Sequence, residues 1–349
     1  MKYRILVVCN NAHGNEDAVG KHGKMLSDYF VKMGHESVVL SGKSGFGKYS
    51  SFLSLVMSWV ICKAAFYTVK RKYDFIIVEY PFKEHNPLIV LFYLLLFGAT
   101  KLSHTKLLLS MHEYDRVNVL RKKVIDVFMR FSDWIFVSEE KYLKKFGHLS
   151  KKMSIRTIPN HIVCERKDKT YNPHAFCYMG LVNKSKAFGE MLKAWESFNE
   201  KGENILDIIS SSDLSEWHLE RYKGIRYHHN LTNAEMVDVM FSCAFAIVPI
   251  LPEIGYNNSS FVSAIQCGCL SIGKFGISLK DNPFALNVKD YSVDSMVKTL
   301  CRAQQITNED FNRLSQMCVE FGKQFSLENT ALQMIESMNR IKEKDYDNN

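Results

Sequence analysis

The feature that most limits the fold is an alternation of short apolar runs with amphipathic helical segments, which occurs twice along the chain. The first series contains expected strands at 3–8, 37–40, 74–79, 105–110 and 134–138. The second begins near Ala175, with expected strands at 176–180, 205–210, 224–229, 245–250 and 269–273. Strands that alternate with helices form parallel sheets that are covered on both faces. The pattern therefore predicts two α/β domains.

Length and composition agree with a folded protein of two domains. The chain has 349 residues, 46% of them hydrophobic and 23% charged, which excludes disordered and collagen-like chains. The net charge of +8 favours anionic partners, namely phosphates, nucleic acid or acidic lipids, and does not choose among them. Nine cysteines without a CxxC pair indicate a reducing compartment and argue against zinc. The start resembles a buried strand more than a signal peptide, so we expect a cytoplasmic protein.

Two segments mark the boundaries of the domains. Residues 154–170 contain Ile158-Pro159-Asn160 and a charged run, which are typical of a linker. The last helix is expected at 326–341, behind Ser326 as its N-cap, with a frayed polar tail after it.

Two stretches of the first domain are unusually apolar. Residues 53–69 end in the basic cluster Lys70, Arg71 and Lys72, and residues 88–97 are nearly continuous hydrocarbon. Both are shorter than the roughly 18–20 residues that span a bilayer. An apolar helix that ends in a basic cluster suits an anchor at the surface of an anionic membrane. The alternative is a buried helix of the α/β domain, and both interpretations stay open.

Nucleotide motifs are incomplete. Residues 42–49 fit GxxxxGK, but Tyr49 stands where a P-loop has its magnesium-binding Ser or Thr. A P-loop ATPase is therefore an alternative, and a plain glycine-rich loop is another. The loop after the first strand lacks GxGxxG, which argues against a dehydrogenase. Asp-x-Asp occurs only in the tail, at 345–347, so no metal site is expected.

Several segments, taken in order, resemble the GT-B glycosyltransferases of the broad family 4 type. They are Gly34-His35-Glu36, the strand end Ser110-Met111-His112-Glu113, Ile158-Pro159-Asn160, Tyr178-Met179-Gly180 with Lys186, the segment 233–249, the helix start 263–269, and Phe325-Ser326-Leu327. The chain departs from the family at Leu181, where an arginine is usual, and at Ser263, where the second of two glutamates is usual.

The resemblance implies an α/β GT-B fold, with two Rossmann-like domains whose parallel sheets face a central cleft. Residues 1–163 would bind the acceptor and residues 164–325 the nucleotide sugar, while 326–349 would form a helix that packs back on the first domain, and a polar tail. The implied activity is metal-independent transfer, with retention, from a nucleotide sugar to a saccharide or lipid-linked saccharide in surface polysaccharide or glycan synthesis.

The resemblance also implies partners and cofactors. No cofactor is expected, because the nucleotide sugar is a substrate, and UDP and GDP both stay open as its nucleotide. The expected partners are this donor and the saccharide acceptor, but not nucleic acid. If the segment 53–72 is a membrane anchor, an anionic membrane is a further partner, and the protein would be peripheral on its inner face. A GT-B subunit that binds without turnover is a further alternative.

The expected site residues follow from the matched motifs. His112 would meet the reacting groups, since imidazole titrates near neutral pH. Glu253 would bind the sugar if the loop 254–260 is two residues longer than usual. Donor binding is assigned to Lys184, Lys186, His228, Asn258, Ser259, Ser260 and Ser263. The acceptor side is assigned to His13, Gly14, Glu113 and Asp115.

Overall fold

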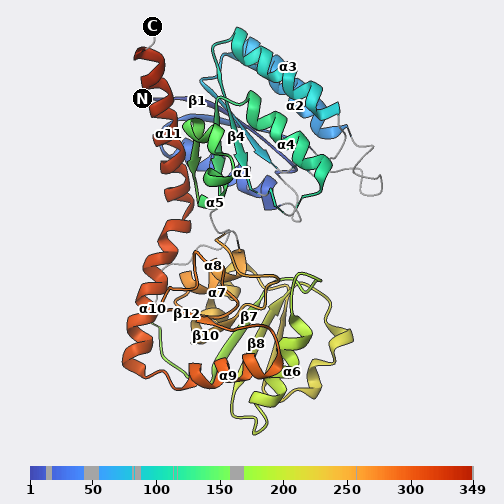
Figure 1. Cartoon of the computed structure of the whole chain (residues 1–349), viewed down its shortest axis with the longest axis vertical. Helices are drawn as coiled ribbons and strands as arrows, with labels where there is room; N and C mark the ends of the chain where they lie inside the picture. Colours follow the sequence, from blue (N-terminus) through green and yellow to red (C-terminus); the bar gives the residue numbers. More distant parts are fainter. Residues whose placement is uncertain are drawn as a thin grey trace. The chain divides into compact units, whose positions relative to one another are not determined.

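In the computed structural model, the chain forms two compact units (Figure 1). Unit 1 comprises residues 1–159 and 327–349, and unit 2 comprises residues 160–326. The residues that the structure describes are 1–12, 18–42, 55–80, 82, 88–112, 114, 115, 117–157, 169–256 and 258–347. The glycine-rich segment 43–49 lies outside them, and so do His13, Gly14 and Glu113.

Unit 1 is built on a sheet of six parallel strands in the order β2-β1-β3-β4-β5-β6. Its strands are β1 (Arg4–Cys9), β2 (Glu36–Ser41), β3 (Phe75–Tyr80), β4 (Lys106–Met111), β5 (Trp134–Val137) and β6 (Met153–Ile155). Its helices are α1 (Ala18–Lys32), α2 (Val56–Arg71), α3 (Leu88–Leu102), α4 (Val119–Phe131), α5 (Glu140–Lys145) and α11 (Leu327–Asp347), with a 3₁₀ segment at Gly147–Lys152.

Helices cover both faces of this sheet. Successive residues of a strand point to opposite sides, so they lie alternately in two cores. Ile5 and Val7 of β1 lie in one core with α1 and α11. Leu6 and Val8 lie in the other core, with α2, α3 and α4.

The last helix joins this unit through buried apolar contacts. Ala331, Met334 and Met338 of α11 are fully buried in the core that contains β1 and α1. In addition, Thr330 Oγ1 donates to the carbonyl of Thr157 over 3.0 Å.

Unit 2 has a second parallel sheet of six strands, in the order β12-β11-β10-β7-β8-β9. The strands are β7 (Ala175–Met179), β8 (Ile205–Ser210), β9 (Ile225–His229), β10 (Phe245–Ile247), β11 (Leu270–Gly273) and β12 (Ala285–Asn287). The helices are α6 (Phe188–Phe198), α7 (Asn233–Ser242), α8 (Ser259–Gln266), α9 (Val293–Gln304) and α10 (Asn308–Gly322), with 3₁₀ turns at Ser215–Trp217, Leu219–Arg221 and Lys323–Phe325.

The structure corrects three expectations about the elements. The segment expected as linker from residue 154 begins as β6, because Met153 and its neighbours pair with β5 at the sheet edge. The short strand β12 was not expected. The last helix continues to Asp347 instead of ending near 341, so most of the tail expected to fray is helical.

Candidate functional site

In unit 2, the ammonium group of Lys186 and the N-terminus of α8 both lie close to Gly180, the residue that follows β7. Gly180 has φ +137°, a conformation that favours glycine. A methyl group at this position would lie 2.9 Å from Ser260 Oγ and 3.7 Å from Lys186 Nζ. The ammonium and the hydroxyl therefore approach the same space above Gly180, which a side chain would fill.

Ser260 lies in the first turn of α8, and this position brings its hydroxyl close to Gly180. Asn258 is the N-cap of this helix, and its side chain accepts a hydrogen bond from the N–H of Phe261 over 3.2 Å. The N–H groups of a first helical turn carry a partial positive charge and are suited to bind anions. Lys186 is half-buried, Ser260 is buried and Ser259 is exposed. Lys186 Nζ, Ser260 Oγ and the N–H groups in the first turn of α8 together form a cradle suited to a phosphate, which we call the Gly180 cradle.

Backbone pairing holds the lysine in position. Lys186 forms an antiparallel bridge with Ile250, in the segment that follows β10. The N–H of Ala187 donates to Pro249 over 2.8 Å, and the N–H of Leu251 donates to Ser185 over 2.9 Å. The loop that carries Lys186 is therefore fixed at the carboxyl end of the sheet, where α/β domains bind ligands.

The other expected donor residues lie in different surroundings. Lys184 is exposed and Ser263 is buried within α8. Glu253 is exposed, and its Oε1 would lie 3.0 Å from a methyl group placed on Gly276. His228 Nε2 lies 2.7 Å from Oδ1 of the buried Asp207.

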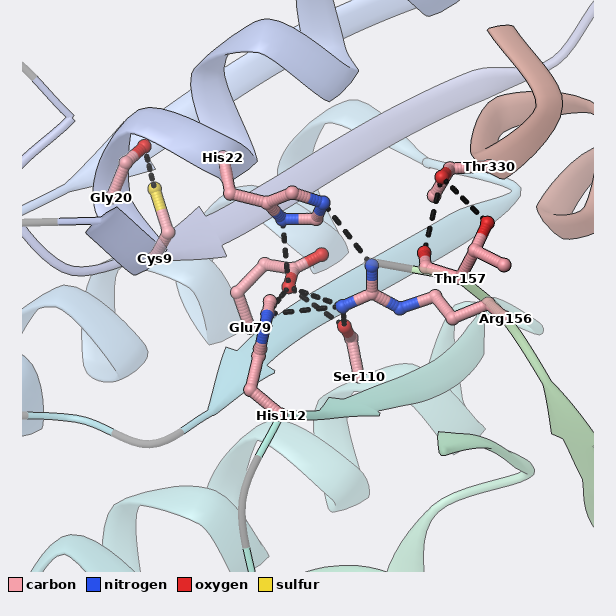
Figure 2. Close-up of polar contacts among 9 residues, drawn as sticks. All are labelled: Cys9, Gly20, His22, Glu79, Ser110, His112, Arg156, Thr157 and Thr330. Atoms are coloured by element: carbon pink, nitrogen blue, oxygen red, sulfur yellow. Dashed lines mark hydrogen bonds and ion pairs between the residues drawn. The ribbon is translucent and has the colours of Figure 1, made fainter. Parts of the chain in front are cut away.

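In unit 1, His112 belongs to a buried cluster of polar groups around one carboxylate (Figure 2). Glu79 Oε2 lies 2.5 Å from His112 Nε2 and accepts from Ser110 Oγ over 2.7 Å. Arg156 Nη2 donates to the same oxygen over 3.1 Å, and His22 Nδ1 is 3.3 Å from it. We call these five residues the Glu79 cluster.

Burial and neighbouring groups act in opposite directions on the pKa of Glu79. Burial alone would raise the pKa of Glu79, but the charge of Arg156 and the contacts with the two histidine rings outweigh it and hold that pKa well below its usual value. Burial lowers the pKa of His22 to about 3, so this imidazole is neutral at pH 7. The cluster is therefore a carboxylate neutralised by a guanidinium.

The cluster also has the composition of a metal site. Ligand atoms of His22, Glu79 and His112 all lie within 4.8 Å of one another. However, Arg156 Nη1 is 3.1 Å from His22 Nε2, and Nη2 is 3.0 Å from His112 Nε2 and 3.1 Å from Glu79 Oε2. A divalent cation among these atoms would stand in contact with the guanidinium and be repelled by it. The geometry fits Arg156 as the counter-ion and does not fit a metal.

Asp115, which was expected on the acceptor side, takes part in surface ion pairs. Its carboxylate lies 2.6 Å from Lys145 Nζ and 3.3 Å from Lys141 Nζ. Partial burial raises the pKa of Asp115, but the two lysines outweigh this effect and lower it below its ordinary value.

Four members of the Glu79 cluster were not expected from the sequence, namely His22, Glu79, Ser110 and Arg156. The signal for Glu79 is a single carboxylate in the otherwise apolar strand sequence of β3. Arg156 lies in the segment that was interpreted as linker, so its burial could not be anticipated.

Comparisons with known proteins identify the fold. No protein-family model matches the chain, and no curated protein matches it. The fold is the GT-B fold of glycosyltransferases, in which both domains are Rossmann-like.

Three solved structures illustrate this similarity. A glycosyltransferase from Rickettsia africae has 12% identity and TM-score 0.68, with 97% of this chain and 98% of that chain covered. HepE from Anabaena, in complex with UDP and glucose, has 9% identity and TM-score 0.67, with 97% and 99% covered. An α-glucosyltransferase in complex with UDP and DNA containing a HMU base has 16% identity and TM-score 0.64, with 97% and 100% covered.

These comparisons overturn one expectation. Nucleic acid was excluded as a partner, but the α-glucosyltransferase that shares the fold was solved with DNA containing a HMU base, an A:G mismatch or an abasic site. The exclusion is wrong, because a protein of this fold binds DNA.

Proposed function

We propose that the chain is a glycosyltransferase that uses a UDP-sugar as donor and a saccharide or lipid-linked saccharide as acceptor. The observation that carries the proposal is the Gly180 cradle, in which Lys186 Nζ, Ser260 Oγ and the N-terminus of α8 approach one space. The proteins of the same fold that were solved with UDP support the choice of nucleotide.

The proposed reaction needs positive charge at the leaving group. The bond between the anomeric carbon and the diphosphate oxygen breaks, the acceptor oxygen bonds to that carbon, and the acceptor proton passes to a base. Negative charge develops on the departing UDP, and preorganised donors stabilise it. Lys186 and the N–H groups of α8 would supply this stabilisation without a metal. His112 would hydrogen-bond the donor sugar or take the proton.

Release of UDP tests this proposal. The wild-type protein, given UDP-glucose and other sugar nucleotides with candidate acceptors, should release nucleoside diphosphate in the presence of EDTA. Lys186→Ala should lower turnover by about tenfold to a hundredfold, as expected when a hydrogen bond to a charged group is lost. Glu253→Ala tests whether this carboxylate binds the sugar.

Other outcomes separate the alternatives. Binding of UDP without turnover of any donor indicates a subunit that only binds. Magnesium-dependent ATP hydrolysis that needs Lys48 indicates an ATPase. Either result contradicts the proposed transferase. For an active enzyme, the anomeric coupling of the product in NMR shows whether the configuration is retained, as we propose.

We further propose that the α2–α3 surface, defined as the exposed faces of these two helices, binds an anionic membrane. Neither helix contains Asp or Glu, and the two pack against each other (Figure 1). Large apolar side chains about half exposed or more follow both helices: Leu55 just before α2, Trp59, Phe66 and Val69 on α2, and Leu88, Leu91, Leu95 and Leu102 on α3.

Basic side chains lie beside these apolar groups. Lys63 lies 5.4 Å from the ring centre of Trp59, and Lys70 lies 5.8 Å from that of Phe66. Lys70, Arg71 and Lys72 are exposed at the end of α2. No helix among the described residues is long and apolar enough to cross a bilayer. Apolar side chains that enter the interface beside lysines that meet lipid phosphates suit peripheral binding.

Vesicle sedimentation tests this surface. Vesicles that contain phosphatidylglycerol should bind the wild-type protein, and changing Lys70, Arg71 and Lys72 to Gln should weaken binding more than tenfold, since each basic group contributes about 1 kcal/mol. Trp59→Ser should weaken it as well. Ile277→Ser, at an exposed site of unit 2, is the control. Unchanged sedimentation of the variants, or binding of duplex DNA in preference to vesicles, would contradict the proposal.

A further inference from the structure

The Glu79 cluster lies where an α/β domain places functional groups. Glu79 of β3 and Ser110 of β4 are paired in register, each one residue before the end of its strand. His112 follows β4 directly, and Arg156 follows β6 directly. The carboxyl ends of parallel strands are the usual location of ligand sites. The cluster thus extends from the interior of unit 1 to this edge of its sheet.

The contact between His112 and Glu79 determines where a proton lies. The nitrogen and oxygen atoms are 2.5 Å apart, and two acceptors without a proton between them would repel each other at that distance. Arg156 Nη2 also lies 3.0 Å from His112 Nε2, but its two hydrogens are used in the bonds to Glu79 Oε2 and Ser110 Oγ, so it does not donate to this nitrogen. Since Arg156 helps to keep Glu79 ionised, the proton belongs to His112 Nε2. In a neutral imidazole with a proton on Nε2, the acceptor nitrogen is Nδ1.

We infer that Glu79 is a positioning residue for His112. Glu79 holds the imidazole ring and fixes the tautomer in which Nε2 is protonated and Nδ1 is the acceptor, while Arg156 keeps Glu79 charged. The inference rests on the proposed function, in which His112 acts on the donor sugar or on the reacting hydroxyl. It adds to that function that His112 acts through Nδ1, and that Glu79 and Arg156 select this nitrogen as the acceptor.

Three groups from three elements determine the charge around the imidazole. Glu79 comes from β3, Arg156 follows β6, and His22 comes from α1 with its ring centre 4.9 Å from that of His112. His22 is neutral at pH 7, so the field at His112 is that of one carboxylate and one guanidinium. Loss of the Glu79 charge would leave Arg156 alone, and the protonated form of His112 would become less stable.

The first test reads the tautomer of the wild-type protein. Long-range ¹⁵N–¹H NMR spectra distinguish the two tautomers, and the His112 signal is assigned by its loss in His112→Gln. We expect a proton on Nε2. A proton on Nδ1 in the neutral ring would overturn the inference. This result does not depend on turnover, so it separates failure of the inference from failure of the proposed function.

The second test removes the charge with Glu79→Gln. We expect kcat to fall about 100-fold, with the KM for the sugar nucleotide within about twofold, because His112 is proposed to act on the reacting groups in the transition state, whereas the Gly180 cradle is proposed to bind the donor diphosphate. The acidic limb of the kcat/KM profile should move to lower pH. An unchanged tautomer with an unchanged acidic limb would overturn the inference.

Ser110→Ala is the matched control. It removes the bond that Ser110 donates to Glu79 Oε2 and the bond that it accepts from Arg156 Nη2, but it keeps both charges, so the tautomer and the acidic limb should stay as in the wild type. A thermal melt shows whether each variant folds. If Glu79→Gln does not fold, the tautomer of the wild-type protein alone decides the question.

Discussion

The charge on Glu79 is tolerated in the interior of unit 1 because several groups compensate it. Burying an isolated carboxylate is costly, and a paired one is stable only when its oxygens receive good hydrogen bonds. Ser110, His112 and Arg156 all contact Glu79 Oε2, whereas Oε1 has no hydrogen-bond partner among the described residues, so the compensation acts through Oε2. Glu79 and Arg156 are 77 residues apart in sequence, so the pair exists only once the sheet has formed.

The cluster makes the stability of the fold depend on pH. The pKa of His22 is 6.5 when unfolded and about 3 when folded, so the unfolded state binds a proton that the folded state does not. The free energy of unfolding should therefore fall as the pH drops from about 6.5 towards 3. The His22 share of this loss at pH 5 is about 2 kcal/mol.

Urea unfolding at pH 7.5 and pH 5.0 measures this effect. In His22→Gln the difference between the two pH values should be smaller than in the wild type. In His148→Gln, which changes an exposed histidine, it should be unchanged. An equal pH dependence in His22→Gln and the wild type would contradict the account.

Gly180 provides a second prediction for a single residue. Gly180→Ala should weaken UDP binding at least tenfold, because the new methyl group fills the space beside Ser260 Oγ and its φ of +137° is unfavourable for alanine. Gly202→Ala is the matched control, since Gly202 also has positive φ but its methyl group would meet only the Lys223 side chain, at 3.4 Å. Calorimetry should show UDP affinity lost in the first variant and kept in the second.

At the scale of single residues, the sequence indicated candidate groups for the Gly180 cradle but not the Glu79 cluster. Lys186, Asn258, Ser259 and Ser260 were expected to act together, and the structure brings Lys186 and Ser260 to the same space over Gly180. Their donor role remains a proposal. The partners of His112 could not be predicted, because they come from three other elements and interact only in the folded sheet.

Among the elements, the strands with long apolar runs were predictable and the short edge strands were not. All ten expected strands occur, with their ends shifted by up to three residues. The strands β6 and β12 contain three residues each and lie at sheet edges, and neither belongs to an apolar run as long as 245–250, which made the equally short β10 predictable. The ambiguity of α2 also has a physical reason, since one of its faces is buried against the core and the other is exposed.

The helix α8 gives a prediction at this scale. Asn258→Ala should cost about 0.5–2 kcal/mol of stability, because the N-cap bond to Phe261 is lost, and it should also weaken UDP binding. Thr307→Ala removes the corresponding cap of α10 and is the control. Urea unfolding should show similar losses of stability, and calorimetry should show weaker UDP binding in Asn258→Ala only. Equal UDP affinity in both variants would contradict the anion site at α8.

At the scale of the whole molecule, the chain enters unit 2 after residue 159 and returns to unit 1 at residue 327. Two α/β units could be predicted from the repeated alternation of strands and helices, and the GT-B fold from motifs spread along the chain. The sugar, the acceptor and the linkage could not be predicted, because they depend on loop shapes that no motif specifies.

The central claim is that unit 2 binds the diphosphate of a nucleotide through Lys186 without a metal. Calorimetric titration with UDP and with uridine, in EDTA, tests it most directly, with Lys193→Ala as control because this lysine is exposed on α6. We predict that Lys186→Ala loses about tenfold to a hundredfold in affinity for UDP and nothing for uridine, while the control binds both like the wild type. Equal binding of UDP by Lys186→Ala and the wild type, or loss of UDP binding by the wild type in EDTA, would contradict the claim.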